Sequence, residues 1–412
     1  METKNKEYKA IGIKELDDWA QNIINVKDTC SGYPVSSVED FDELNSWLHA
    51  NNLNNTPMDN IGDPFAEKHY YTMNTLQFEK EVIEYFAPKY GFRDGEFWGL
   101  VSHSGTDGNA HGLYFGCTYL KSKSNGVMPI AYISDEAHYS NVRLTYVQNI
   151  EVRIVKSDIN GRMIPEELEK VLDPSRPALM IYAFGSTFKG AIDDIDALNA
   201  VLAKFPDMLV YRHVDAALFG GYLPFTDHRD MLDCNKHPFE SIAVSGHKFF
   251  GTKNPSGFFI TKREIYDQQT DNGVQYLKSD MKMISCSRNA MGALQLWWLI
   301  KKIGEAKWAE YADKMLSLTR YMVNELRKIG YPCFVNDLSN TVVIDHPGKY
   351  MVRTYMLINS RDASLLSGKL SHFIVMQQMN KAYIDKFIAD LKKYTIDGEM
   401  PPDSPQPALP SN

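Results

Sequence analysis

The chain has 412 residues, a net charge of −8, 44% apolar residues and 23% charged residues. These values are typical of a globular protein with a sizeable core, organised as two or three domains or as one large α/β unit. The acidic balance argues against nucleic acid or an anionic membrane as the main partner, because both favour a basic face. No apolar run approaches the ~20 residues that a membrane-spanning helix needs.

The N-terminal stretch is charged and mixed and lacks the apolar core of a secretory signal. The cysteines lack CxxC spacing, which predicts free thiols in a reducing compartment rather than a disulfide frame or a zinc site. We therefore expect a cytoplasmic protein without a structural metal. The five cysteines are Cys30, Cys117, Cys234, Cys286 and Cys333.

Residues 1–70 are expected to form an N-terminal arm with helical segments at 14–29 and 38–52, where acidic and apolar positions recur at helical spacing. The next segment, NTLQFEKEVIEYFAPKYGF, has apolar residues three and four positions apart and predicts an amphipathic helix.

Residues 71–275 are expected to form the large domain. From about residue 98, short β-rich runs alternate with helical patterns, which predicts a mostly parallel sheet with helices on both faces. Ligands of such sheets bind outside the carboxyl ends of the strands. The predicted strands lie in WGLVSHSG, MPIAYISD, EVRIVKSD, ALMIYAFGS, MLVYRHVDAA and SIAVSGHK.

Residues 276–396 combine long helical patterns with two short strand-like runs, NTVVIDHP and SHFIVMQQM, and predict a smaller α+β C-terminal domain. Residues 397–412 are rich in proline and polar residues and are expected to be a disordered tail.

The sharpest chemical signal is SGHK at 245–248, which follows the apolar strand of residues 241–244. A lysine at a strand end in apolar surroundings has its charge disfavoured by desolvation. The neutral amine that results is the form needed to capture a carbonyl group. A lysine that simply reaches solvent gives the same string. Lys189, in FGSTFKGAIDD, is a rival lysine after a less tightly patterned strand.

Two further strand ends carry polar groups that suit a cofactor. Asp215, in HVDAALFGGYLPF, ends a strand and precedes two small residues. Its carboxylate can pair with a protonated pyridine nitrogen, although a helix N-cap is an alternative interpretation. SHSGTDGNAHG at 102–112 joins a strand to a helix and offers hydroxyl and backbone N–H donors for a phosphate. An ordinary turn is the alternative interpretation of this segment.

His138 follows the strand in MPIAYISD, where an imidazole can stack on an aromatic cofactor or serve as a structural histidine. Ser186 and Thr187 end another strand as possible cofactor contacts. The order along the chain is phosphate loop, histidine, Ser-Thr turn, aspartate and lysine, each at a predicted strand end.

That order and these strings resemble the group II family of pyridoxal-phosphate-dependent amino-acid decarboxylases, over about residues 30–390. Within the family, the strings look closest to those of bacterial histidine decarboxylases, with plant serine decarboxylases next. The motifs that carry the resemblance are SGYP at 31–34, GDPF at 62–65, QFEKEVIEYF at 77–86, TDGN at 106–109, HYS at 138–140, KGAIDDI at 189–195, VDAAL at 214–218, VSGHK at 244–248 and SRN at 287–289.

The resemblance implies the aspartate-aminotransferase-like fold (PLP-dependent transferase type I), pyridoxal 5′-phosphate as cofactor, and a homodimer with shared active sites. It implies that Lys248 forms the Schiff base, Asp215 pairs with the pyridine nitrogen and His138 stacks on the ring. The remaining implied contacts are Gly105, Thr106, Ser245 and His247 to the phosphate, Ala217 and Thr187 beside the cofactor, and Tyr33 and Ser287 near the substrate.

The implied reaction is decarboxylation of an L-amino acid, with L-histidine to histamine as the first expectation and serine or another polar amino acid as the alternative. Relatives commonly have a Pro-x-Pro-Cys-Gly type loop after the lysine, whereas this chain has TKNPSG at 252–257. Lys253 is expected to add positive charge near the cofactor. An aminotransferase, a carbon–carbon lyase and a non-catalytic relative of the same fold are competing interpretations.

Overall fold

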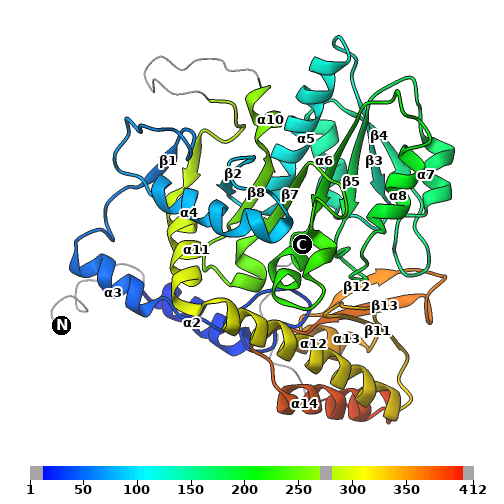
Figure 1. Cartoon of the computed structure of the whole chain (residues 1–412). Helices are drawn as coiled ribbons and strands as arrows, with labels where there is room; N and C mark the ends of the chain where they lie inside the picture. The colour runs from blue at the N-terminus through cyan, green and yellow to red at the C-terminus, as the bar shows by residue number, and fades with distance from the viewer. Residues whose placement is uncertain (1–12, 270–280, 402–412) are drawn as a thin grey trace.

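The computed structural model describes residues 13–269 and 281–401. Its centre is a seven-stranded sheet in the order β2-β8-β7-β6-β5-β3-β4 (Figure 1). Only β8 runs antiparallel to its neighbours within this sheet. The mostly parallel sheet predicted from the sequence is therefore confirmed. Its strands are β2 (Phe97–Ser102), β3 (Ile130–Ser134), β4 (Glu151–Val155), β5 (Ala178–Ala183), β6 (Val210–Asp215), β7 (Ser241–Ser245) and β8 (Gly257–Lys262).

Both faces of this sheet are buried. Neighbouring residues of one strand belong to different apolar clusters: Tyr132 packs in the larger cluster, while Ala131 and Ile133 pack in the smaller one. This explains why the strands read as continuous apolar runs rather than as alternating ones. The helices around the sheet are α5 (Gly105–Lys123), α6 (Tyr139–Val147), α7 (Pro165–Val171), α8 (Ile195–Leu202), α9 (Phe219–Tyr222) and α10 (Arg263–Asp267), with short turns η2 (Leu223–Phe225), η3 (Arg229–Leu232) and η4 (Gly246–Phe250).

Helix α5 lies unusually close to the sheet because glycines face it at four-residue spacing. A Cβ atom on Gly112 would lie 2.3 Å from Nδ1 of His213, and one on Gly116 would lie 2.5 Å from Leu179. Larger residues would push the helix away from the strands. The close packing fixes the N-terminus of α5 next to the ends of β6 and β7.

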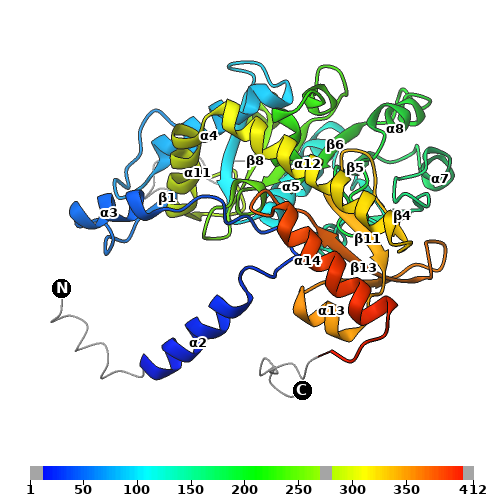
Figure 2. The same ribbon diagram turned by 90° about the horizontal axis from the view of Figure 1, so that it is seen from below.

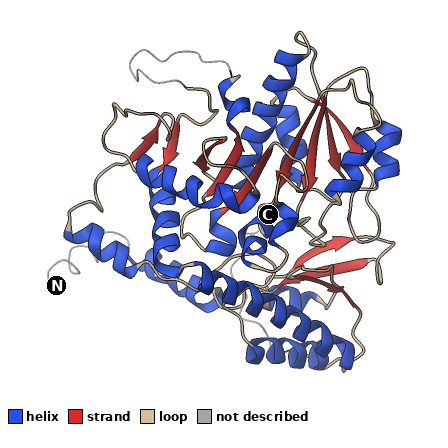
Figure 3. Cartoon of the chain, viewed as in Figure 1, coloured by secondary structure: helices blue, strands red, loops and turns tan. Residues whose placement is uncertain are grey.

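A second, antiparallel sheet has the order β10-β11-β13-β12 and is separate from the first (Figure 3). It is built from β10 (Cys333–Phe334), β11 (Thr341–Asp345), β12 (Ile358–Arg361) and β13 (Lys369–Ile374). Helices α12 (Glu305–Lys328), α13 (Lys349–Thr354) and α14 (Lys381–Leu391), with η5 (Lys392–Ile396), accompany it. The expected domain division stays a prediction, and residues 402–412 of the expected tail lie outside the described residues.

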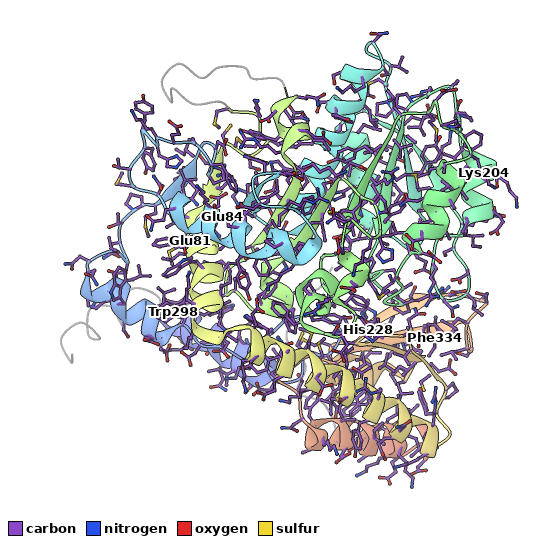
Figure 4. The ribbon with its side chains drawn as sticks, in the orientation of Figure 1. Glu81, Glu84, Lys204, His228, Trp298 and Phe334 are labelled. Carbon is purple, nitrogen blue, oxygen red and sulfur yellow. The ribbon has the colours of Figure 1, made fainter. Side chains whose placement is uncertain are left out.

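The N-terminal segment contains α2 (Ile13–Val26), α3 (Asp42–Ala50) and β1 (Asp59–Ile61), which pairs with β9 (Ser287–Asn289). Helix α4 (Leu76–Phe86), followed by η1 (Ala87–Tyr90), packs against α11 (Ala290–Ile303). Trp297 of α11 donates a hydrogen bond to Glu81 of α4 at 2.8 Å. Figure 4 labels Glu81 and Glu84, which both lie on α4.

A buried ion pair joins these segments to the large sheet. Arg288 and Glu79 have fully buried side chains and lie 3.0 Å apart. Glu79 also accepts hydrogen bonds from Asn60 at 2.6 Å and from the backbone of Val101 at 3.0 Å. Within the described residues, no helix is both long enough and apolar enough to cross a membrane.

Candidate active site

A cavity of about 610 Å³ lies at the carboxyl ends of β3, β5, β6 and β7 and at the N-terminus of α5. This is the edge of the sheet where the sequence predicted a ligand site. All but one of the predicted site residues line it. They are Tyr33, Gly105, Thr106, His138, Thr187, Asp215, Ala217, Ser245, His247 and Lys248.

Lys248 lies in η4, directly after β7. Burial lowers the pKa of its amine, and the Asp215 carboxylate opposes this effect. The described residues provide its nitrogen with no hydrogen bond or ion pair, unlike Lys189, which pairs with Glu136 at 2.9 Å and Asp362 at 2.7 Å. An amine biased towards its neutral form and facing a cavity suits carbonyl capture. The paired Lys189 does not.

Asp215 is the last residue of β6 and is buried. Its Oδ2 accepts a hydrogen bond from Nδ2 of Asn141 at 2.8 Å. The next helix, α9, begins at Phe219 with Leu218 as its N-cap, so Asp215 does not cap it. The aspartate therefore presents a buried, oriented carboxylate to the cavity, which a cationic ring nitrogen could pair with.

The N-terminus of α5 forms an anion cradle. Ser104 is the N-cap residue, and its side chain accepts a hydrogen bond from the backbone of Asp107. A Cβ atom on Gly105 would lie 2.5 Å from Oγ of Ser245 and 3.3 Å from Ala217. Only glycine leaves this space open at the positive end of a 19-residue helix, where backbone N–H groups favour a phosphate.

His138 lines the cavity and also caps the helix that follows it. Its ring lines the cavity, and its Nδ1 lies 2.7 Å from Oγ of Ser140 and accepts from the backbone of Ser140 at the start of α6. Burial is the largest influence on its ring and lowers the pKa of His138. A neutral imidazole fixed by its own helix can lie flat against an aromatic ring without adding charge.

The opposite wall of the cavity comes from distant parts of the chain. Residues 32–35 contribute from the N-terminal segment, while Ile358, His372 and Ile374 contribute from the four-stranded sheet. Backbone hydrogen bonds hold the two together, with Ile374 N to Ser31 O at 2.6 Å. The sequence had placed the SGYP segment near the substrate, but it gave no indication that β12 and β13 form part of the same wall.

Two of the expected residues do not line the cavity of this chain. Ser287 is exposed on β9, and its carbonyl oxygen lies 3.1 Å from Nε2 of His103. Its expected place near the substrate at a dimer interface stays a prediction. Lys253 is also exposed and lies outside the cavity, with its nitrogen 5.7 Å from the centre of the Phe41 ring.

Comparison with known proteins places this site in a family. Residues 120–343 match the pyridoxal-dependent decarboxylase conserved domain. The chain belongs to the pyridoxal-dependent decarboxylase family. It is an amino-acid decarboxylase with pyridoxal phosphate as its cofactor, as the sequence strings indicated.

Among curated relatives, serine decarboxylase 1 of Oryza sativa is 31% identical, over 87% of this chain and 71% of that protein. Histidine decarboxylase of Morganella morganii is 32% identical, over 87% of this chain and 91% of that protein. The crystal structure of L-methionine decarboxylase from Streptomyces sp. 590 has a TM-score of 0.81 at 20% identity, covering 94% of this chain and 96% of that one. The last likeness confirms the fold alone.

The residues of this decarboxylase fit the cofactor. The glycine-lined cradle suits its phosphate, the buried carboxylate suits its ring nitrogen, and the unpaired amine suits its aldehyde. Asn141 and His372 belong to the site in ways that the sequence analysis missed. Asn141 was detectable as a polar residue three positions after His138, on the buried face of a helix.

Proposed function

We propose that this decarboxylase converts L-histidine to histamine and carbon dioxide. The observation that carries the proposal is the charge content of the cavity. Apart from histidines, its described lining residues include only two charged side chains, Lys248 and Asp215. Both are the residues that suit the aldehyde and the ring nitrogen of the cofactor. The wall that faces them is made of Tyr33, Val35, Ile358 and neighbouring apolar groups. Such a wall suits a flat, largely neutral side chain better than a second carboxylate or an ammonium group.

The reaction then follows from side chains of this chain. Lys248 would hold the cofactor through its amine. Asp215 would pair with the pyridine nitrogen of the cofactor, and Asn141 orients Asp215 through its hydrogen bond. When bound, the cofactor supplies the electron sink that stabilises the carbanion left by carbon dioxide. Gly105, Thr106, Ser245 and His247 would hold its phosphate, and Ala217, Thr187 and His138 would lie beside its ring.

A proton must replace the departing carbon dioxide at the substrate α-carbon. The cavity offers Lys248, His138 and tyrosine hydroxyl groups for this transfer.

Serine is the second candidate, because serine decarboxylases of Oryza sativa are as similar to this chain as the histidine enzymes are. The GDPF string does not add to that case. Its Asp63 accepts hydrogen bonds from Trp98 and Tyr266, both at 2.8 Å, and lies outside the cavity lining. This carboxylate has a structural role that says nothing about the substrate.

The test is kcat/KM for histidine, serine, glutamate, aspartate, tyrosine and 2,4-diaminobutyrate at cofactor saturation. A site that hydrogen-bonds a polar side chain rejects an analogue without it by ~10⁴–10⁵. Histidine is expected to be the best or second-best substrate, and a lower rank contradicts the proposal. Carbon dioxide release without keto-acid formation separates decarboxylation from transamination.

The enzyme is further proposed to be a cytoplasmic homodimer with shared active sites, with Ser287 reaching the substrate of the partner's site. Free thiols at all five cysteines support a reducing compartment. Helix α2 supports association, since it stands apart from the body of the chain (Figure 2). Its Leu16, Trp19, Ile23 and Ile24 are exposed, so an apolar helix face lacks a partner within one chain. Light scattering of fully active protein that shows only monomer at micromolar concentration contradicts the dimer.

A further inference from the structure

His372 connects two walls of the active-site cavity through a single imidazole ring. It lies on β13 and is 2% exposed. Its Nδ1 is 3.2 Å from the carbonyl oxygen of Phe188, and its Nε2 is 3.1 Å from the carbonyl oxygen of Gly32. The ring also stacks on the Phe188 ring, with centroids 4.8 Å apart and planes 22° apart.

Each carbonyl group belongs to a segment that forms the site. Gly32 directly precedes Tyr33, and Phe188 directly follows Thr187; both Tyr33 and Thr187 line the cavity. The chain is tightly packed at Gly32, where a Cβ atom would lie 2.2 Å from the carbonyl oxygen of Met356. A change in the His372 hydrogen bonds is therefore passed directly to two cavity walls.

The protonation state of the ring determines how many of the two carbonyl groups it can donate to. A neutral imidazole has one N–H donor and one lone pair, whereas an imidazolium has two donors. Carbonyl oxygens only accept, so neutral His372 can bond to Phe188 or to Gly32 but leaves a lone pair facing the other oxygen. Only the protonated ring completes both hydrogen bonds.

The surroundings hold both segments near the ring. Ser31 exchanges backbone hydrogen bonds with Tyr355 and Ile374, and the two ion pairs of Lys189 anchor the residue after Phe188. The imidazole is the adjustable link between these two anchored segments.

Burial lowers the pKa of His372, and the two carbonyl groups partly oppose it. No charged side chain is among these influences. The titratable and charged groups on the elements packed around the ring and across the cavity include Lys27, Asp28, Cys30, Tyr33, Glu136, His138, Lys189, Asp215, Lys248, Asp345, Tyr355, Arg361, Asp362 and Lys369. Protonation of the ring is therefore expected at a lower pH than that of an ordinary histidine.

We propose that His372 is a positioning residue for substrate binding: its ring links the Gly32 and Phe188 carbonyl groups, and protonation allows both hydrogen bonds to form at once. The consequence for catalysis rests on the proposed decarboxylation, but this hydrogen-bonded link does not. The protonated ring fixes the walls that carry Tyr33 and Thr187, so substrate binds more tightly as pH falls. The chemical step is affected less, because His372 has both nitrogens occupied by backbone groups.

The experiment compares His372→Phe and His372→Gln with the wild type between pH 5 and pH 8, at cofactor saturation. Phenylalanine keeps the stacked ring without hydrogen bonds, and glutamine keeps a donor that does not titrate. We expect KM of the best substrate to rise about tenfold in His372→Phe at pH 5.5, with kcat changing less, as loss of one or two hydrogen bonds predicts. The ratio of KM between His372→Gln and the wild type should change with pH, because only the wild type has a titrating group at this position. Titration of the substrate and the cofactor is common to both proteins and cancels in the ratio.

A second measurement needs neither substrate nor turnover. Hydrogen exchange of residues 30–36, corrected for its intrinsic pH dependence, should slow in the wild type between pH 7.5 and pH 5.5 and show no such change in His372→Gln. His346→Gln is the matched control, since His346 directly follows β11, does not line the cavity, and accepts a hydrogen bond at its ring from the backbone of Gly348. The proposal is overturned if His372→Phe has the KM and the hydrogen exchange of the wild type. It is also overturned if the exchange of residues 30–36 in His372→Gln depends on pH as it does in the wild type. If the protein shows the expected exchange pattern but is inactive towards every amino acid, the proposed function alone is refuted.

Discussion

Replacement of Asn141 by leucine tests how Asp215 is held in the active site. The Asn141 amide donates to the Asp215 carboxylate at 2.8 Å, and its own Oδ1 has no partner among the described residues. Leucine has nearly the same size and removes both the donor and the unpaired acceptor. The free energy of unfolding should therefore change little, while Asp215 loses its side-chain donor.

The size of the effect follows from the type of bond. A hydrogen bond to a charged group contributes about 1.5–3 kcal/mol, which corresponds to a fall in kcat/KM of about 10- to 150-fold. The remaining donor to Asp215 is the backbone of Ala217 at 3.3 Å, which is too long to compensate fully. Asn141→Ala is the matched variant, because the space it leaves can admit a water molecule that restores part of the activity.

A double-mutant cycle with Asp215→Asn decides the interpretation. If Asn141 acts through the Asp215 carboxylate, Asn141→Leu should add almost nothing to the loss already caused by Asp215→Asn. The assay is steady-state decarboxylation at saturating cofactor, with thermal unfolding to verify the fold. Full activity of Asn141→Leu, or a loss that adds to that of Asp215→Asn, refutes the reasoning.

Three further predictions concern the cofactor site and the core beneath it. Lys248→Ala should abolish turnover, and borohydride reduction of the wild type should label Lys248; a label on Lys189 contradicts the assignment. Gly105→Ala should weaken cofactor binding at least tenfold in an absorbance titration without lowering the melting temperature, since the new Cβ enters the cradle 2.5 Å from Ser245. Burial lowers the pKa of His213 to about 4, below the ~6.5 of an unfolded histidine. The stability that its neutral ring provides is thus present above pH 6.5 and lost as pH falls towards 4. Urea unfolding at pH 7 and at pH 4.5 gives the free energy of unfolding that is lost between them. This loss should be about 2–3 kcal/mol smaller in His213→Gln than in the wild type.

The cofactor half of the site could be predicted from the sequence because it lies at strand ends. The polar residue lies at the end of its apolar strand or in the turn after it, as with Asp215 at the last position of β6 and Lys248 in the turn after β7. The parallel arrangement brings these ends to one edge of the sheet. Strand β8 escaped prediction because GFFITK follows an aromatic-glycine stretch and runs antiparallel, without the helix that marked the other strands.

The substrate half could not be predicted in the same way, because its residues meet only through long-range packing. His372 reads in the sequence as one polar residue of the strand-like run SHFIVMQQM, a pattern that a core histidine also gives. Its partner Gly32 lies 340 positions earlier in the chain, and no local pattern connects them. Lys253 was misplaced for the same reason, since proximity to Lys248 in sequence did not bring it to the cavity.

The strings that resemble the family most specifically also explain why the substrate is hard to infer. Glu79 of QFEKEVIEYF and Arg288 of SRN form one buried ion pair, and Asp63 of GDPF holds Trp98 and Tyr266. These contacts fix the N-terminal segment and α11 against the large sheet, so the strings follow from the architecture that many substrates can share. We therefore expect specificity to depend on the wall formed by residues 32–35, β12 and β13. Because that wall is assembled from three distant segments, a few changes within it can alter the substrate while every cofactor contact stays in place.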